Sequence, residues 1–302
     1  MRQWSELENQ MTSVERVVDY INLESEEQVA TAAERPPPHD WPKEGRLEFR
    51  NVYLMYSQED SYVLKNVNFM VKSEEKVGIV GRTGAGKSSL IAALFRLTPV
   101  EGKILIDDLL IRDYPLYAVR SKISIIPQEP MLFSGTLRKN LDPFDEYTDA
   151  ELWSALEEVE LKTTVMESPS ELNTKMSEGG SNFSVGQRQL LCLARAVIRK
   201  NKILVLDEAT ANVDPKTDGL IQKTIRRKFE KCTVLTIAHR LNTVMDSDKV
   251  LVMDTGSVAE FDHPYILLQK KGMFYEMVQQ LGKAMAESLS NIAEMVSVVI
   301  FC

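Results

Sequence analysis

The stretch GRTGAGKS, residues 81–88, decides how the rest of this 302-residue sequence is interpreted. It fits the pattern G-x-x-x-x-G-K-[ST], in which backbone N–H groups of a glycine-rich loop close around phosphates. The apolar run KVGIVG leads into it and a helical pattern follows it, so we expect this loop between a buried strand and a helix. A nucleoside triphosphate is therefore the expected ligand of this segment, which is called the phosphate loop below.

The phosphate loop and the start of the next helix supply most of the predicted ligand contacts. Lys87 would place a positive charge beside the β- and γ-phosphates, and the Ser88 hydroxyl can ligate Mg²⁺. The predicted contact residues in this region are Gly81, Arg82, Thr83, Gly84, Ala85, Gly86, Lys87, Ser88 and Ser89.

A second stretch, ILVLDE at residues 203–208, is an apolar run that ends in two carboxylates. Side chains alternate along a strand, so Asp207 and Glu208 point in different directions and can do different work. Asp207 can hold Mg²⁺ through water, while Glu208 polarises the attacking water. Such a pair alone is typical of a solvated strand end, but beside a phosphate loop it predicts a hydrolytic site.

The composition is that of a soluble globular protein, with 44% hydrophobic and 26% charged residues. The net charge of -8 disfavours a nucleic-acid partner, because affinity for a phosphate backbone depends on clustered Lys and Arg. Cys192, Cys232 and Cys302 show no metal-like spacing, which indicates packed thiols in a reducing compartment. We find no signal peptide and no apolar run near the roughly 20 residues of a membrane-spanning helix, so the chain alone is expected to be soluble and cytoplasmic.

Three parts are predicted along the chain. Residues 1–45 combine an amphipathic helix with a linker that is first acidic and then proline-rich, and residues 46–275 form the main domain. Residues 276–302 continue as helix to about Met295 and end in VSVVIFC, for which we predict no chemistry. The apolar stripe of the first helix consists of Trp4, Leu7, Met11, Val14, Val18 and Ile21.

The main domain is expected to be of the α/β class. Alternation between Leu47 and Val71 predicts an N-terminal antiparallel β subdomain with one wet face. Residues 140–200, approximately, are mainly helical and predict an inserted helical subdomain, and residues 249–262 predict a hairpin around Asp254, Thr255 and Gly256. The short apolar runs KVGIVG, KILID, KISIIP, KILVLDE and CTVLTIAH predict buried strands of a mostly parallel sheet between helices.

The segment SNFSVGQ, residues 181–187, resembles the signature sequence of the ATP-binding cassette family. Further motifs follow the order of that family: Gln128 resembles its Q-loop glutamine, Asn212, Val213 and Asp214 its D-loop, and His239 its switch histidine. Tyr56 resembles the aromatic residue that stacks on adenine. The resemblance covers roughly residues 46–275, and its details are most similar to the carboxy-terminal nucleotide-binding domain of the multidrug-resistance-associated proteins, in the family's C group.

This resemblance implies a P-loop NTPase (RecA-like) core that binds and hydrolyses ATP with Mg²⁺. It implies catalytic roles for Lys87, Gln128, Glu208 and His239, and metal contacts from Ser88, Gln128 and Asp207. It also implies that two such domains pair head to tail, so that one domain's signature contacts the ATP of the other. The residues expected at the cofactor from the carboxy-terminal half are Ser184, Gly186 and Gln187, which face the partner's ATP, and Asp214.

One position departs from the family's commonest signature, which has a second glycine where this chain has Val185. A branched side chain restricts the backbone, so we expect the composite site completed by this signature to hydrolyse poorly. The chain's own Lys87, Ser88, Asp207 and Glu208 are intact, so the site on its phosphate loop is expected to be hydrolytic.

Three functional hypotheses follow. The first is the ATPase motor of a membrane exporter, which requires transmembrane domains that this chain lacks and works at the cytoplasmic face of a membrane. The second is a soluble cassette ATPase without a membrane partner, although such proteins usually carry long coiled coils or basic surfaces that are not present here. The third is a truncated product that does not transport. The transported substrate is not encoded in these residues.

Overall fold

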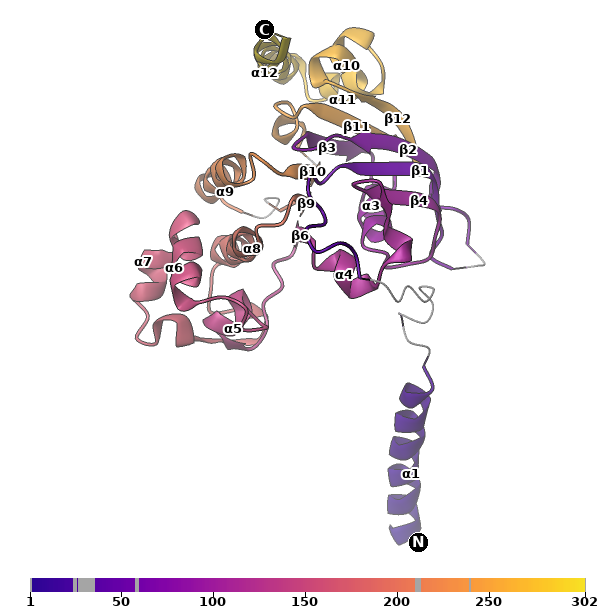
Figure 1. Cartoon of the computed structure of the whole chain (residues 1–302), viewed down its shortest axis with the longest axis vertical. Coiled ribbons are helices and arrows are strands. Elements are labelled where there is room, and N and C mark those ends of the chain that lie inside the picture. Colours follow the sequence, from indigo (N-terminus) through magenta and orange to yellow (C-terminus); the bar gives the residue numbers. More distant parts are fainter. Residues whose placement is uncertain are drawn as a thin grey trace.

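Two β-sheets enclose a helix, and further helices cover the outer face of one of the sheets (Figure 1). The computed structural model describes residues 2–23, 26, 36–57, 60–209, 213–238 and 240–301, of which residues 2, 3, 5, 7, 9 and 297–301 are described by their backbone only. Three positions named above, Asn212, His239 and Cys302, lie outside the described residues.

The smaller sheet is antiparallel, with the strand order β2-β1-β4-β5. Its strands are β1 (Leu47–Leu54), β2 (Leu64–Val71), β4 (Val100–Ile106) and β5 (Leu109–Leu110). Buried and exposed side chains alternate along β2, which confirms the predicted antiparallel strands with one wet face.

Strand β4 is a correction, because its apolar run KILID was predicted in the parallel sheet. Instead β4 pairs antiparallel with β1, so that Ile104 faces Phe49 and Ile106 faces Leu47. A short apolar run has the same pattern in either kind of sheet, and only pairing with a distant strand decides between them.

The larger sheet has six strands in the order β12-β11-β3-β10-β9-β6. All neighbouring pairs are parallel except β11 with β12, which form the predicted hairpin at one edge. The predicted mostly parallel sheet is therefore confirmed. Its strands are β3 (Lys76–Gly81), β6 (Ile123–Ile126), β9 (Ile203–Asp207), β10 (Thr233–Ile237), β11 (Lys249–Asp254) and β12 (Ser257–Asp262).

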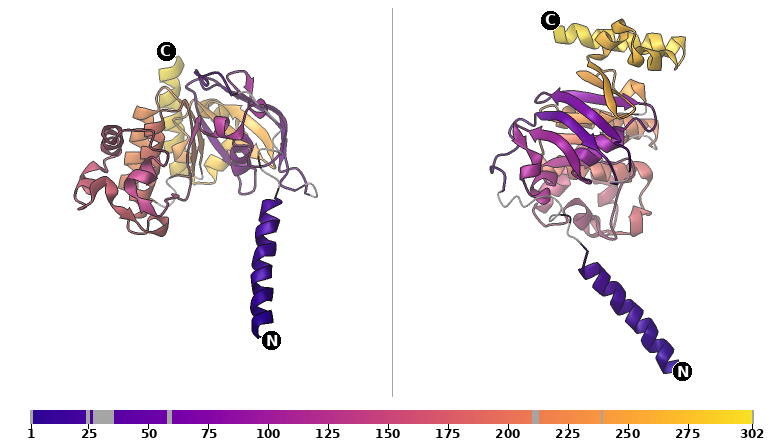
Figure 2. Two further views of the ribbon diagram at one scale, coloured as in Figure 1. Left: turned by 60° about the horizontal axis from the view of Figure 1, so that its bottom comes forward. Right: turned by 90° about the vertical axis from the view of Figure 1, so that its right-hand side faces the viewer.

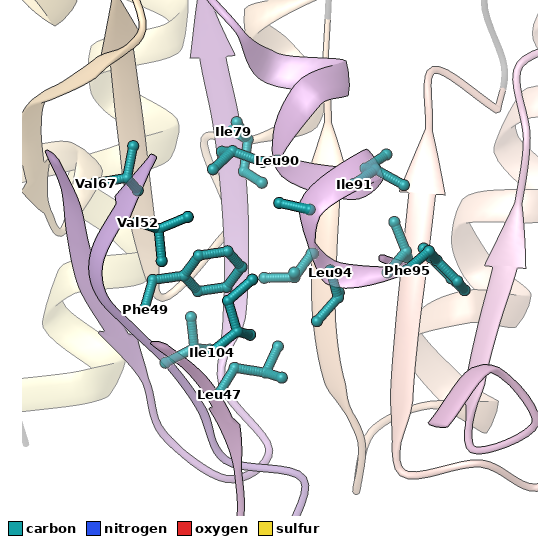
Figure 3. Packing of buried hydrophobic residues seen from close by; sticks show 14 of the residues in the cluster. Leu47, Phe49, Val52, Val67, Ile79, Leu90, Ile91, Leu94, Phe95 and Ile104 are labelled. Atoms are coloured by element: carbon teal, nitrogen blue, oxygen red, sulfur yellow. The ribbon is translucent and has the colours of Figure 1, made fainter. Parts of the chain in front are cut away.

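Both faces of this parallel sheet are buried, and β9 shows how. Ile203 and Val205 join the core around helix α3 (Lys87–Leu94), whereas the alternate residues Leu204 and Leu206 join the core around helix α8 (Val185–Arg199). This alternation explains why β9 is a continuous apolar run. Figure 3 shows the first core, in which Leu90, Leu94 and Phe95 from the α3 region lie between the two sheets.

The segment between β6 and β9 contains α8 and several shorter elements, which lie to one side of the parallel sheet (Figure 1). They share one core with α8 and with the helix α9 (Pro215–Lys228) that follows β9. The shorter elements are α5 (Leu137–Leu141), α6 (Asp149–Glu158), α7 (Lys162–Met166) and the strands β7 (Gly135–Thr136) and β8 (Lys175–Met176); α4 (Leu116–Arg120) precedes β6.

The helices at the two ends of the chain behave differently. Helix α1 (Arg2–Ile21) projects away from the sheets in all views, and its Trp4, Val14 and Ile21 side chains are exposed (Figures 1 and 2). At the other end, α10 (Pro264–Lys270), α11 (Met273–Gln279) and α12 (Lys283–Phe301) pack together over β11 and β3.

Helix α12 continues beyond Met295, where the helical pattern was expected to end. Val and Ile lower helix propensity only modestly, and an existing helix propagates readily. Across the part of the chain that the structure describes, no helix combines the length and the apolar character needed to span a membrane.

Asp107, which follows β4, fixes the point at which the chain enters the smaller sheet, just before β1. Its carboxylate accepts hydrogen bonds from the backbone N–H groups of Lys43, Glu44, Gly45 and Arg46, at 2.7 to 3.2 Å. One side chain therefore satisfies four consecutive donors, which would otherwise have to bind water.

We predict that Asp107→Asn lowers the free energy of unfolding by about 1 kcal/mol, because one acceptor oxygen becomes a donor that faces N–H groups. Urea denaturation measures this change. The matched control is Asp108→Asn, because both residues have positive φ (50° and 65°) and Asn tolerates that conformation. Asp108 forms only a surface ion pair with Arg46, so its loss is expected to cost little. Equal effects of the two substitutions would contradict the prediction.

Candidate functional site

The phosphate loop connects the carboxyl end of β3 with the start of α3, as the sequence predicted. Gly84 and Gly86 have φ values of 79° and 97°, in the left-handed region that favours glycine. Gly86 is also the N-cap of α3, and a Cβ atom there would approach Leu64 to 3.0 Å. The loop therefore forms a tight turn, and its backbone N–H groups lie at the N-terminus of α3, where they can bind an anion.

Lys87 is buried behind this loop, with 6% of its surface exposed. Its Nζ donates to the backbone oxygens of Gly81, at 2.9 Å, and Arg82, at 3.2 Å. Burial lowers the pKa of Lys87, while the charges of Glu208 and Asp207 act in the opposite direction. The cation is thus held by carbonyl dipoles and faces two carboxylates, an arrangement into which a polyphosphate with Mg²⁺ fits electrostatically.

The two carboxylates lie at the same sheet edge as the phosphate loop. Ile237 of the central strand β10 is in register with Ile79 on one side and with Asp207 on the other. The backbone N–H of Glu208 donates to Ile237 O at 3.1 Å, although Glu208 has the left-handed φ of 48°. A non-glycine residue in this region carries backbone strain, of about 1 kcal/mol or more, which the surrounding sheet must hold in place.

Gln128 follows β6, whose last residue Ile126 is in register with Leu206 of β9. It lines a cleft of about 800 Å³ together with Val185, Gln189 and Ala209. The structure therefore brings Gln128 to the same edge of the sheet as Glu208. Gln128 also lies next to the start of α8, because Val185 lines the same cleft. His239 is outside the described part of the chain.

Tyr56 contacts helix α3, which follows the phosphate loop. Its hydroxyl oxygen lies 3.0 Å from Ser89 Oγ, and 56% of the residue is exposed. The neighbouring aromatic residues Tyr53 and Tyr62 instead pack against each other, with ring centroids 5.4 Å apart. Of these three tyrosines, Tyr56 is the one with a hydrogen bond to α3.

The signature segment, residues 181–187, leads into helix α8, whose first turn is closed by a capping box that was not predicted. Ser184 is the N-cap of α8: its hydroxyl accepts from Gln187 N at 3.1 Å, while Gln187 Oε1 accepts from Ser184 N at 2.9 Å. The spacing Ser-x-x-Gln is the sequence signal of such a capping box. The Ser184 O–H is still able to donate outward, so a structural and a ligand-binding use are compatible.

Val185 is the first residue of α8 and is not among the residues with positive φ, so its branched side chain is accommodated there without the strain of a left-handed backbone. Gly186 is buried, and a Cβ atom there would lie 3.1 Å from Thr217 Cγ2 and 3.5 Å from Asp214 Oδ2. Glycine therefore allows α8 and α9 to approach closely. Asp214 caps α9 by accepting from Lys216 N and Thr217 N, and the hydrogen bonds with Thr217 lower its pKa.

The predicted residues thus form two groups. The phosphate loop, Asp207, Glu208 and Gln128 share the carboxyl edge of the parallel sheet, with Tyr56 at the side. Ser184, Gly186 and Gln187 form a second group at the start of α8, beside Asp214. Because α3 and α8 pack on opposite faces of the sheet, each group presents its own helix N-terminus (Figure 1).

The known proteins that this chain resembles are ATP-binding cassette proteins. Residues 64–211 match the ABC transporter family. The chain is 60% identical over 98% of its length to human (Homo sapiens) ATP-binding cassette sub-family C member 4, and 57% identical over 97% to the Drosophila melanogaster probable multidrug resistance-associated protein lethal(2)03659. It spans about a fifth (22%) of each of these relatives.

A solved structure of a bacterial Atm1-family ABC exporter with ATP bound is similar to 80% of this chain. The TM-score is 0.74 at 33% identity, and the similar region makes up 43% of that exporter's chain.

The capping box leads to a prediction for the free chain. Ser184→Ala should lower the free energy of unfolding by about 1 kcal/mol without any nucleotide, because an N-terminal donor of α8 loses its acceptor. Thermal or urea unfolding measures it, and Ser181→Ala, in an exposed serine outside the box, is the control. Unchanged stability of the Ser184 variant would contradict a stabilising contribution of this cap.

Proposed function

The chain carries a nucleotide-binding domain that belongs to the ABC transporter family and binds ATP, and from this premise we propose that it hydrolyses ATP to drive a membrane exporter. The observation that carries the proposal is the shared sheet edge, where the register of β3, β10 and β9 sets the phosphate loop beside Asp207 and Glu208. A charge-neutralising loop and an activating carboxylate at one edge are the parts that phosphoryl transfer requires.

We propose the following division of labour. The backbone N–H groups of residues 81–89 and the Lys87 ammonium bind and orient the phosphates, and the Tyr56 ring stacks on the base. Glu208 accepts a proton from the attacking water, and Gln128 and His239 orient that water and the γ-phosphate. Backbone strain at Glu208 fits a residue that is held in position for chemistry.

A Mg²⁺ ion fits the oxygen donors at this edge. The Ser88 hydroxyl is exposed at the start of α3, and Asp207 is partly exposed at the end of β9. Among the described residues there is no cluster of three or more His, Cys, Asp or Glu that could hold an ion alone. This composition suits Mg²⁺, which usually takes one or two protein ligands together with phosphate oxygens and water. When bound, the ion supplies charge neutralisation between the phosphates.

We further propose that the second group of residues serves a partner domain. Ser184, Gly186 and Gln187 start a different helix from the phosphate loop, on the opposite face of the sheet, so they are suited to the ATP of a second nucleotide-binding domain paired head to tail. Val185 places a branched side chain in the first turn of α8, where the family's commonest signature has glycine. This side chain would slow hydrolysis in the composite site that the signature completes.

The membrane partner is part of the proposal, because the chain spans only about a fifth of its transporter relatives. We propose that transmembrane domains supply the substrate pathway and that this domain works at the cytoplasmic face. A soluble cassette ATPase and a fragment without transport activity remain the alternatives, and co-fractionation of the native protein with alkaline-washed membranes would separate them from the exporter.

Glu208→Gln tests the hydrolytic role. We expect turnover of Mg-ATP to fall by about 100-fold or more while ATP binding is kept, because the amide cannot accept the proton of the attacking water. Phosphate release and equilibrium binding of a fluorescent ATP analogue measure the two effects. Glu230→Gln, at an exposed carboxylate after α9, is the control. Turnover equal to that of the unchanged protein would remove Glu208 from this role.

Substitutions at Tyr56 test the stacking role. Tyr56→Ala should weaken ATP binding by about tenfold, because a stacked base contributes roughly 1–3 kcal/mol. Tyr56→Phe keeps the ring but loses the contact with Ser89, so it should bind ATP almost normally. Isothermal titration calorimetry compares both variants with Tyr53→Ala. A larger loss in the Tyr53 variant would reassign the stacking residue.

A further inference from the structure

Gln189 is a buried polar residue in helix α8, with 1% of its surface exposed. Its side-chain amide nitrogen Nε2 donates to two backbone oxygens from different loops, Pro127 O at 2.9 Å and Ala209 O at 2.5 Å. The two N–H bonds of one amide group thus join two segments that lie 82 residues apart in sequence and are both outside α8.

The two acceptors are direct neighbours of residues that the proposed reaction uses. Pro127 precedes Gln128, and Ala209 follows Glu208. The Pro127 carbonyl shares one planar peptide unit with the Cα of Gln128, and the Cα of Ala209 belongs to the planar peptide unit that joins it to Glu208. A shift of Gln189 is therefore expected to move Gln128 and Glu208 together.

Helix α8 holds the Gln128 loop at a second point. The partly buried guanidinium of Arg195, nearly two turns further along α8, donates to Met131 O at 2.6 Å and to Asn140 O at 2.5 Å. The backbone on both sides of Gln128 is consequently attached to one helix. Of the two side chains, however, Gln189 is the one that also binds the Glu208 loop.

The other end of the Gln189 amide, its carbonyl oxygen, finds no partner among the residues that the structure describes. This atom, Oε1, is buried. A buried acceptor without a partner is costly, and an apolar side chain of similar size would avoid that cost. Packing of α8 alone therefore does not account for glutamine at this position, whereas a bridge between the two loops does.

We propose that Gln189 is a positioning residue that couples the Gln128 loop to the Glu208 loop through α8. The inference rests on the proposed ATP hydrolysis, since it assigns Gln189 to the alignment of that site. Helix α8 begins with the signature segment, which is proposed to contact a partner's nucleotide. The Gln189 bridge therefore connects that segment with the chain's own hydrolytic residues. A displacement of α8 by the partner would then realign both loops at once.

The test is Gln189→Met, which keeps a side chain of similar length and volume but has no N–H donors. Hydrogen–deuterium exchange of the nucleotide-free chain is measured in peptides that contain Gln128 and Glu208. We expect exchange to rise about tenfold in both peptides, because two hydrogen bonds that restrain them are lost. The matched control is Leu190→Met, at a neighbouring α8 position that is also buried and makes no bond to either loop.

Two results would overturn the coupling. If only one peptide or neither exchanges faster, Gln189 does not bridge the loops; if exchange rises throughout the chain together with a lower Tm, its role is purely structural. With ATP, Gln189→Met is expected to lower kcat by at least tenfold and leave the Kd for ATP within about twofold. The exchange measurement needs no turnover, so a chain that proves inactive would reject the proposed function while the exchange data still decide whether Gln189 bridges the loops.

Discussion

Burial of strand β9 on both faces is the constraint on which the rest of the structure depends. Its alternate residues belong to two different cores, one containing α3 and the other α8. A strand that is covered on both sides has no wet face, so its polar residues can lie only at its ends. Asp207 is the last residue of this strand and Glu208 follows it, and the parallel register with β10 and β3 sets the strand end level with the phosphate loop.

The same burial separates the two helix starts that the function is proposed to use. Helix α3 presents glycines with positive φ and a buried lysine, and it leads out of the parallel sheet through a tight loop. Helix α8 presents a Ser-x-x-Gln capping box and a glycine that packs against α9. The first start is shaped to enclose an anion, whereas the second is a rigid surface that is complete before any ligand arrives. This difference fits the separate roles proposed for the two helix ends.

Several polar side chains at the site have structural roles as well as their proposed functional ones. Asp214 caps α9, and Ser184 and Gln187 cap α8. Lys87 is restrained by two carbonyls of its own loop, and Glu208 is held at a strained φ by the sheet beside it. Each group is therefore fixed before ligand binding, which reduces the conformational entropy lost when the reacting groups are aligned.

The sequence by itself determined the α/β class, most strands, and the positions of the phosphate loop and the carboxylates, because strand alternation, apolar runs and glycine spacing are local properties. It also contained the Ser-x-x-Gln spacing of a capping box at the start of α8. It could not assign KILID to the antiparallel sheet, nor reveal that Gln189 bridges Pro127 and Ala209. Both depend on pairing between segments distant in sequence, and no local pattern encodes such partners; the tertiary structure alone decided them.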